Sequence, residues 1–162
     1  MIRVAVDTVR ISLKGPERAV LLKEAEQERQ LPIFIHATEA EAIANELEGY
    51  KPLRPLTHDL LKNCITTLGG ELQYVLINDL RDNVFYAVLH VVQSGREIDI
   101  DARPSDSIAL AVRARVPIFV AEKVMEAAGV YPAEEVSEDT EKLAVFRDFV
   151  ETLGLDDLED GK

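Results

Sequence analysis

The chain has 162 residues, of which 47% are hydrophobic and 30% are charged, and its formal net charge is −12. This length suits one domain with an appendage, and it is sufficient to bury a substantial core. No apolar run approaches the roughly 18 residues of a membrane helix, and the acidic balance argues against a protein that coats DNA or RNA through a basic surface.

The N-terminal residues predict an antiparallel meander of three strands. Residues 2–13 alternate apolar and polar side chains, and a change of parity near residues 7–8 predicts a bulge or bend. A turn at residues 14–17 and an apolar run at 19–22 complete a hairpin, and a further run at 31–35 predicts the third strand. The first residues lack the long apolar core of a signal peptide.

Two helices are predicted next. Residues 38–41 have the form of a capping box, with Thr38 as N-cap and Glu41 as its partner, and they open a helix that Gly49 ends. An extended connector with two prolines leads to Thr57, a good N-cap for the second helix. The apolar stripe of this second helix consists of Leu60, Leu61, Cys64, Ile65 and Leu68.

This stripe predicts that Cys64 is a buried thiol. Because Cys64 is the only cysteine, it cannot form an internal disulfide, and we expect a reducing, cytoplasmic compartment.

A second meander and two further helices complete the predicted body. Its strands are expected at residues 72–80, 84–92 and 97–102, with tight turns between them. A helix over residues 105–115 is apolar nearly all round and should be buried. A short strand at 116–120 and a helix at 122–128 follow.

The C-terminal residues form a separate, acidic appendage in this interpretation. Residues 134–162 hold 11 acidic and 3 basic side chains, so they carry −8 of the net charge. Residues 133–140 lack apolar periodicity and predict a linker, and residues 143–153 predict an amphipathic helix. That helix could bind the body, a second subunit or the groove of a partner through its apolar face.

The predicted fold class is therefore α+β. A mixed, mostly antiparallel sheet would form from the two meanders, with helices packed on it and a C-terminal amphipathic helix added. The expected domains are residues 1–133 and the appendage 134–162.

The strand-to-helix corner at residues 97–107 is the strongest candidate site. Asp101 ends a strand, Asp106 lies in the first turn of the following helix, and Arg103 stands between them. Carboxylate oxygens suit Mg²⁺ or Mn²⁺, and a guanidinium can bind a phosphate in a bidentate manner. A structural interpretation fits the same corner. In it, Asp106 favours the helix dipole, Ser105 caps the helix, Arg103 pairs with Asp101, and Asp99 belongs to a solvated strand face.

A second corner precedes the helix that Thr57 opens. His58 could act as a general acid or base, while Asp59 could equally be a capping residue favoured by the helix dipole. His36 and His90 are interpreted as structural. Glycine-rich phosphate loops, serine-hydrolase elbows, cysteine pairs for zinc and His-Glu-x-x-His motifs are all missing from the sequence, which argues against those chemistries.

Three segments resemble the hallmark motifs of the bifunctional nuclease family. They are EAEAIA at residues 39–44, RPLTHDLL at 54–61 and IDARPSDSIALA at 100–111. The resemblance extends over about residues 1–133 and implies DNase and RNase activity, which is attributed to a few members. The positions shared with the motifs are Glu39, Glu41, His58, Asp59, Asp101, Arg103, Ser105 and Asp106.

The resulting hypothesis is a metal-dependent nuclease that binds nucleic acid as a substrate rather than as a tight ligand. The expected catalytic residues are His58, Asp59 and Arg103. The expected substrate contacts are Arg54, Thr57 and Ser105, and the expected ligands of Mg²⁺ or Mn²⁺ are Asp99, Asp101 and Asp106. The alternative hypothesis is a non-catalytic module that binds a small anionic ligand or a protein partner.

Overall fold

The strands and helices follow the predicted order closely. In a computed structural model, which describes residues 1–11 and 18–132, the strands are β1 (Ile2–Ile11), β2 (Arg18–Glu24), β3 (Gln30–Ile35), β4 (Gly70–Arg81), β5 (Val84–Gln93), β6 (Arg96–Ala102) and β7 (Ile118–Val120). The helices are α1 (Ala37–Leu47), α2 (Thr57–Thr67), α3 (Pro104–Ala114) and α4 (Glu122–Ala128). All of these elements belong to one compact unit, Met1–Tyr131.

Three predictions concern residues outside the described ones. They are the turn at 14–17, the linker at 133–140 and the amphipathic helix at 143–153. The domain division at residue 133 also stays a prediction. No helix among the described residues is long and apolar enough to cross a membrane.

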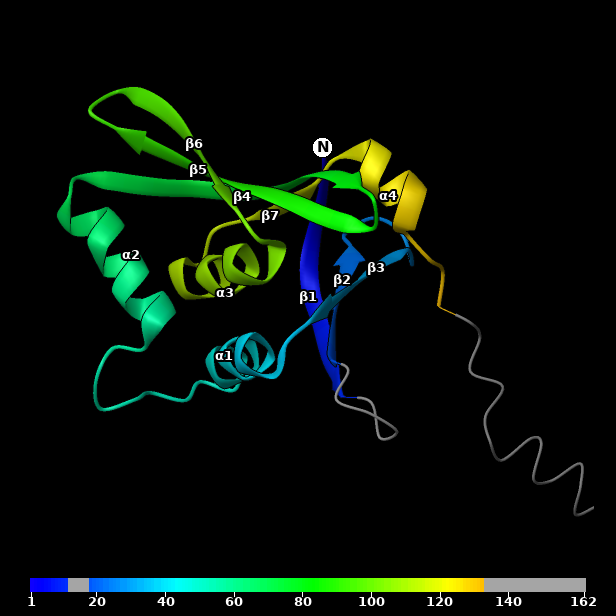
Figure 1. Ribbon diagram of the computed structural model, residues 1–162, viewed down its shortest axis with the longest axis horizontal. Coiled ribbons are helices and arrows are strands. Elements are labelled where there is room, and N and C mark those ends of the chain that lie inside the picture. Colours follow the sequence, from blue (N-terminus) through cyan, green and yellow to red (C-terminus); the bar gives the residue numbers. More distant parts are fainter. Residues whose placement is uncertain (12–17, 133–162) are drawn as a thin grey trace, which may run out of the picture. The chain divides into compact units, whose positions relative to one another are not determined.

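The fold is α+β, as predicted, and its strands form one curled, mixed sheet in the order β3-β2-β1-β7-β4-β5-β6. Both antiparallel meanders are confirmed, and β1 has a register shift between Val6 and Thr8 at the predicted bulge. The short strand β7 joins the meanders, because it pairs antiparallel with β1 and parallel with β4. Figure 1 shows β1–β3 running across the direction of β4–β6, with α1 and α3 in the angle between them.

Helix α3 lies at the centre of the core, as its apolar composition predicts. Ile108, Ala109, Leu110 and Ala111 are fully buried, and the helix packs on β4 and β5. The core around it includes Leu22, Leu31, Ile43, Val75, Ile77, Val120 and Met125. Burial on this scale holds α3 firmly, so side chains in its first turn have well-defined positions.

The predicted helix caps are wrong in detail. Helix α1 begins at Ala37 with His36 as N-cap and no side-chain capping bond, so Thr38 and Glu41 form no capping box. Helix α2 already includes Thr57, and Leu56 is its N-cap. The backbone N–H of Leu56 is satisfied by the carboxylate of Asp59 at 2.8 Å, so no hydroxyl is needed at the cap.

The inward face of α2 also differs from the prediction. Cys64 is exposed, as are the stripe residues Leu60, Leu61 and Leu68. The helix instead turns a face with His58, Lys62 and Ile65 toward the body, and these residues are spaced four and three apart. Polar contacts to α3 fix this orientation, which apolar periodicity alone could not reveal.

Candidate functional site

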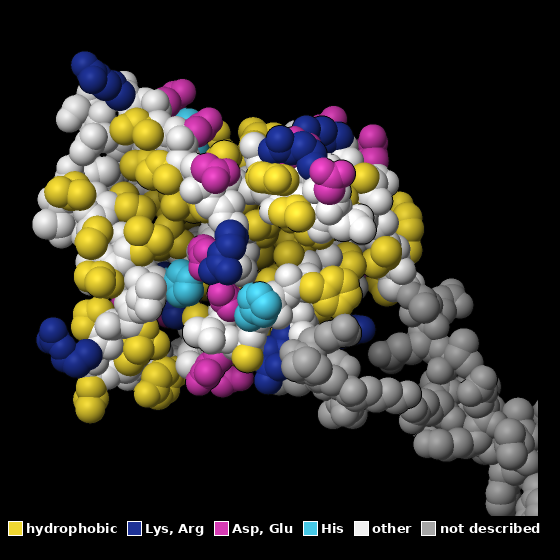
Figure 2. All heavy atoms as spheres, viewed as in Figure 1, with side chains coloured by type: hydrophobic (Ala, Val, Ile, Leu, Met, Phe, Trp, Pro, Cys, Tyr) yellow, Lys and Arg dark blue, Asp and Glu magenta, His cyan; other side chains and the backbone are white. Residues whose placement is uncertain are grey.

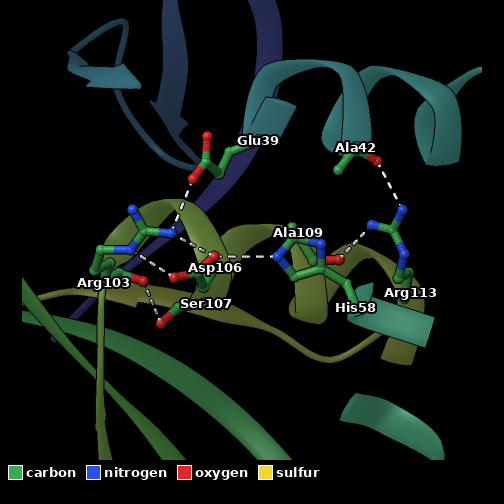
Figure 3. A network of polar contacts seen from close by, with 8 residues as sticks. All are labelled: Glu39, Ala42, His58, Arg103, Asp106, Ser107, Ala109 and Arg113. Atoms are coloured by element: carbon green, nitrogen blue, oxygen red, sulfur yellow. Dashed lines mark hydrogen bonds and ion pairs between the residues drawn. The ribbon is translucent and has the colours of Figure 1, made fainter. Parts of the chain in front are cut away.

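The first turns of three helices meet at one place in the fold (Figure 3). Glu39 is the third residue of α1, His58 the second of α2 and Asp106 the third of α3, while Arg103 is the N-cap of α3. Acidic side chains are favoured in the first turn, because the N-terminal end of a helix carries partial positive charge. Each of the three helices follows an N-cap residue with an extended backbone conformation.

Glu39, His58, Arg103 and Asp106 form a continuous polar network. The guanidinium of Arg103 donates two hydrogen bonds to Asp106, from Nε to Oδ2 at 2.7 Å and from Nη2 to Oδ1 at 3.1 Å. Its Nη2 also donates to Oε1 of Glu39 at 2.8 Å. His58 Nε2 lies at 3.2 Å from Asp106 Oδ1, within hydrogen-bond distance. One carboxylate thus holds both an imidazole and a guanidinium.

The network is open to solvent on the side of Arg103. The Arg103 side chain is 60% exposed, whereas that of His58 is only 11% exposed. Figure 2 shows histidine, acidic and basic side chains gathered in the middle of this face, with hydrophobic side chains around them. Within the described residues, Arg103 Nη1 and His58 Nδ1 make no hydrogen bond, so a donor and a ring nitrogen are available to a ligand.

A second ion pair, between Arg113 and Asp59, locks the three helices together behind the network. Arg113 is buried, and its Nε donates to Asp59 Oδ1 at 2.8 Å. Its other nitrogens donate to the carbonyl oxygens of Ala109 at 2.8 Å and Ala42 at 2.9 Å, so one side chain ties α3 to both α1 and α2. This role of Arg113 was not predicted from the sequence. The available signal was the spacing of Arg113 within the apolar helix, seven residues after Asp106 and thus on the same face.

The electrostatics of the network follow from its contacts. Partial burial acts to raise the pKa of Asp106, but the hydrogen bonds from Arg103 and His58 outweigh it and hold this pKa below its usual value. The hydrogen bonds to Asp106 and Glu39 raise the pKa of Arg103. Both groups are therefore charged at neutral pH.

Asp106 should make folding sensitive to acid. Because its pKa is lower in the folded state, the ionised carboxylate stabilises the fold above about pH 4, and this contribution is lost as the pH falls through the folded-state pKa. We expect the free energy of unfolding of Asp106→Asn to fall less than that of the wild type between about pH 5 and pH 2. Urea unfolding in metal-free buffer over this range measures the difference, and parallel curves for the two proteins would contradict the assignment.

One carboxylate oxygen of Glu39, Oε2, is buried without a hydrogen-bond partner among the described residues. A buried carboxylate oxygen without a partner costs free energy, so such groups are rare in structural positions. Glu39 was recognised only as a motif position in the sequence, and its place in the network was not predicted.

The other predicted metal ligands, Asp99 and Asp101, lie on the face of the sheet that points away from α3. Asp99 is bonded to His90 at 2.7 Å, and Asp101 lies opposite Val88 on the same side of β6. The side of the sheet that faces α3 is instead formed by the buried residues of β5, such as Ala87 and Leu89. Asp106 therefore joins the polar network without them.

The three predicted substrate contacts differ in their exposure and in their distance along the chain from Arg103. Ser105 is buried beside Arg103, whereas Arg54 and Thr57 are exposed. In residues 1–11 and 18–132, no group of three or more His, Cys, Asp or Glu side chains is arranged to hold a metal ion. Metal binding therefore stays a prediction.

A groove of about 290 Å³ borders the network at Arg103. Its walls come from residues 33–36 at the end of β3, residues 83–85 at the β4–β5 turn and residues 103–105 at the start of α3. The groove and the network thus share Arg103 and the same strand-to-helix corner.

Comparison with known proteins gives consistent results. The model of the bifunctional nuclease domain family matches residues 20–133. An uncharacterised protein of Mycobacterium tuberculosis is 40% identical over 160 residues, which cover 95% of this chain and 96% of that protein. Bifunctional nuclease 1 of Oryza sativa subsp. japonica is 28% identical over 120 residues, and Bifunctional nuclease 2 of Arabidopsis thaliana is 28% identical over 110 residues. These matches cover 72% and 65% of this chain, but only 36% and 33% of the plant proteins.

Proposed function

The chain belongs to the bifunctional nuclease domain family, and from this membership and its polar network we propose that it hydrolyses phosphodiester bonds in DNA and RNA. The observation that carries the proposal is the carboxylate of Asp106, which holds the imidazole of His58 and the guanidinium of Arg103 side by side. Phosphodiester hydrolysis needs proton transfer and stabilisation of charge on the phosphoryl oxygens, and these two side chains supply both.

Arg103 would bind the scissile phosphate. Its Nε and Nη2 are occupied by Asp106 and Glu39, which fix the plane of the guanidinium. The remaining nitrogen, Nη1, can donate to a phosphoryl oxygen at the exposed side of the network. A guanidinium oriented in advance stabilises developing charge without the cost of reorganisation.

His58 would move the proton that hydrolysis requires. As water attacks phosphorus and the bond to the sugar oxygen breaks, a proton leaves the water and another reaches the departing oxygen. The contact between Nε2 and Asp106 orients the ring. The other ring nitrogen, Nδ1, has no hydrogen-bond partner among the described residues and can accept the proton of the water or donate one to the departing oxygen. Asp59 was predicted as catalytic, but both its oxygens are occupied by Leu56 and Arg113. We therefore assign it the role of positioning the first turn of α2.

A divalent cation, Mg²⁺ or Mn²⁺, is the proposed cofactor. The two carboxylates and one guanidinium of the polar network carry a summed charge of −1, which repels a phosphodiester unless a cation compensates. The carboxylate of Asp106 and the unpartnered Oε2 of Glu39 fit a hard cation, which prefers oxygen ligands. Such an ion would polarise the phosphoryl group and activate water. Asp99 and Asp101, which the sequence also offered as ligands, face the other side of the sheet and are not part of this proposed site.

Metal removal tests the proposal directly. Purified protein should cleave single-stranded RNA and DNA in Mg²⁺ or Mn²⁺, and excess EDTA should lower the rate at least about 100-fold, because charge compensation and water activation are both lost. Gel analysis of end-labelled oligonucleotides measures the rate, and added Mn²⁺ should restore it. Equal cleavage in EDTA would refute the metal dependence. Absence of cleavage with either ion would refute the proposed nuclease function.

The alternative of a non-catalytic module for a small anion rests on one feature. An exposed guanidinium at the meeting point of three helix N-termini could also hold a phosphate without cleaving it. The two neighbouring carboxylates oppose this, since they leave the network negative. Binding of inorganic phosphate by isothermal titration calorimetry, in a protein that cleaves no substrate, would favour the module.

A further inference from the structure

We propose that the groove beside Arg103 is a nucleobase subsite, in which one unstacked base of a single-stranded substrate lies on Phe34 next to the scissile phosphate. This inference rests on the proposed function, because it takes the ligand to be the nucleic-acid substrate. It adds the part of the substrate that is recognised and predicts a preference for single strands.

Phe34 is the central residue of the proposed subsite. It lies near the end of β3, and its side chain is 72% exposed. Large aromatic side chains are normally buried, because leaving them in water forfeits about 1.5–3 kcal/mol. The neighbouring Val84, also 52% exposed, lies at the β4–β5 turn in the same groove. The fold thus leaves two exposed apolar residues, one aromatic and one aliphatic, in the lining of the same groove.

The groove has the size and lining of a site for one flat ring system. Its volume of about 290 Å³ lies at the lower limit of ligand pockets, which begin near 300 Å³. Phe34, Val84 and Phe85 supply apolar surface, and His36 and Asn83 supply polar groups. Stacking on an aromatic side chain accepts any base, and an imidazole and an amide can reach the polar edges of a base.

The position of Arg103 selects a nucleobase over other flat ligands. Arg103 is a member of the polar network and also lines the groove. A ligand that fills the groove while its phosphate meets Arg103 must carry a ring and a phosphate close together, as a nucleotide does. In a duplex the base is paired and stacked within the helix, so only an unpaired strand can place a base on Phe34.

A tryptophan at this position provides a direct test. The chain contains no tryptophan, so Phe34→Trp introduces a single tryptophan, whose fluorescence can be excited selectively, at the groove. The test uses the full chain with His58→Ala as background, in order that binding is observed without cleavage. A single-stranded oligonucleotide should quench the fluorescence of Phe34→Trp, and an abasic oligonucleotide of equal length, with the same phosphates, should not.

Affinity measurements give the size of the effect. In the same background, Phe34→Ala should weaken the binding of a labelled single strand roughly 5- to 150-fold, as measured by fluorescence anisotropy, because base stacking is worth that much per base. Phe34→Tyr should retain the affinity, since it keeps the ring. Tyr131→Ala is the matched control, because Tyr131 is a 66% exposed aromatic residue outside the groove, and its loss should change affinity less than twofold.

The outcomes separate this inference from the proposed nuclease function. Equal quenching by the abasic strand, or unchanged affinity in Phe34→Ala, would overturn the base subsite even if the wild type cleaves nucleic acid. Quenching by bases in a protein that never cleaves would support the subsite and refute the nuclease proposal. An equal loss of affinity in Tyr131→Ala would show that the effect is not specific to the groove and would also overturn the inference.

Discussion

His58→Ala is expected to cleave single-stranded RNA and DNA about 100- to 10,000-fold more slowly than the wild type. Proton transfer by a positioned side chain contributes a factor of this size, and His58 is the only histidine of the polar network. The buried ring is small enough that the variant should keep its fold, which far-UV circular dichroism can verify. Initial cleavage rates at saturating substrate measure the loss.

The same chain offers a matched control for this variant. His90 also pairs with an aspartate, at 2.7 Å from Asp99, but it lies on the sheet face that does not contact α3. His90→Ala therefore removes the same chemical group from a similar pair and should leave the rate within twofold of the wild type. Full activity in His58→Ala, or an equal loss in both variants, would refute the assignment of His58.

Arg113→Ala is expected to lower the free energy of unfolding by about 3 kcal/mol. Removing one partner of a buried ion pair leaves the other charge uncompensated, and Arg113 also holds carbonyl oxygens of α1 and α3. The loss should lie at the low end of the range of about 3–5 kcal/mol, because Asp59 is 26% exposed and keeps the N–H of Leu56. Urea unfolding followed by circular dichroism measures it.

Arg81→Ala is the control for stability. Arg81 also pairs with an aspartate, Asp79 at 3.1 Å, but its side chain is 60% exposed. An exposed pair contributes at most about 1 kcal/mol, so this variant should unfold near the wild-type midpoint. If the two arginine variants lose equal stability, the buried pair does not hold the three helices together as described.

The fold was predictable where local patterns decide structure. Strand alternation revealed both meanders and the bulge near Thr8, and apolar composition revealed the buried helix α3. The orientation of α2 was not predictable, because its leucines form a regular stripe that the structure leaves exposed. Long-range polar contacts from His58, Asp59 and Lys62 determine which face turns inward, and such contacts leave no periodic signal.

The candidate site was predictable in part. His58, Arg103 and Asp106 were selected from their helix-start positions, and the structure brings them together. Glu39 joins them from a helix that is distant in the sequence, at a separation of 64 residues from Arg103. Asp99 lies on the same side of the sheet as His90 and away from Asp106. The sequence shows that the side chains of β6 alternate, but it does not show which of the two faces the core covers.

The central strand β7 has a consequence for how the molecule is assembled. Its three residues connect β1 to β4, yet they follow nearly all other elements in the chain. During synthesis, each meander can form from neighbouring segments as it emerges, but the continuous sheet must await residues 118–120. Contacts between segments so distant in sequence slow folding, so the joining of the two meanders is a late event that requires synthesis to have passed residue 120.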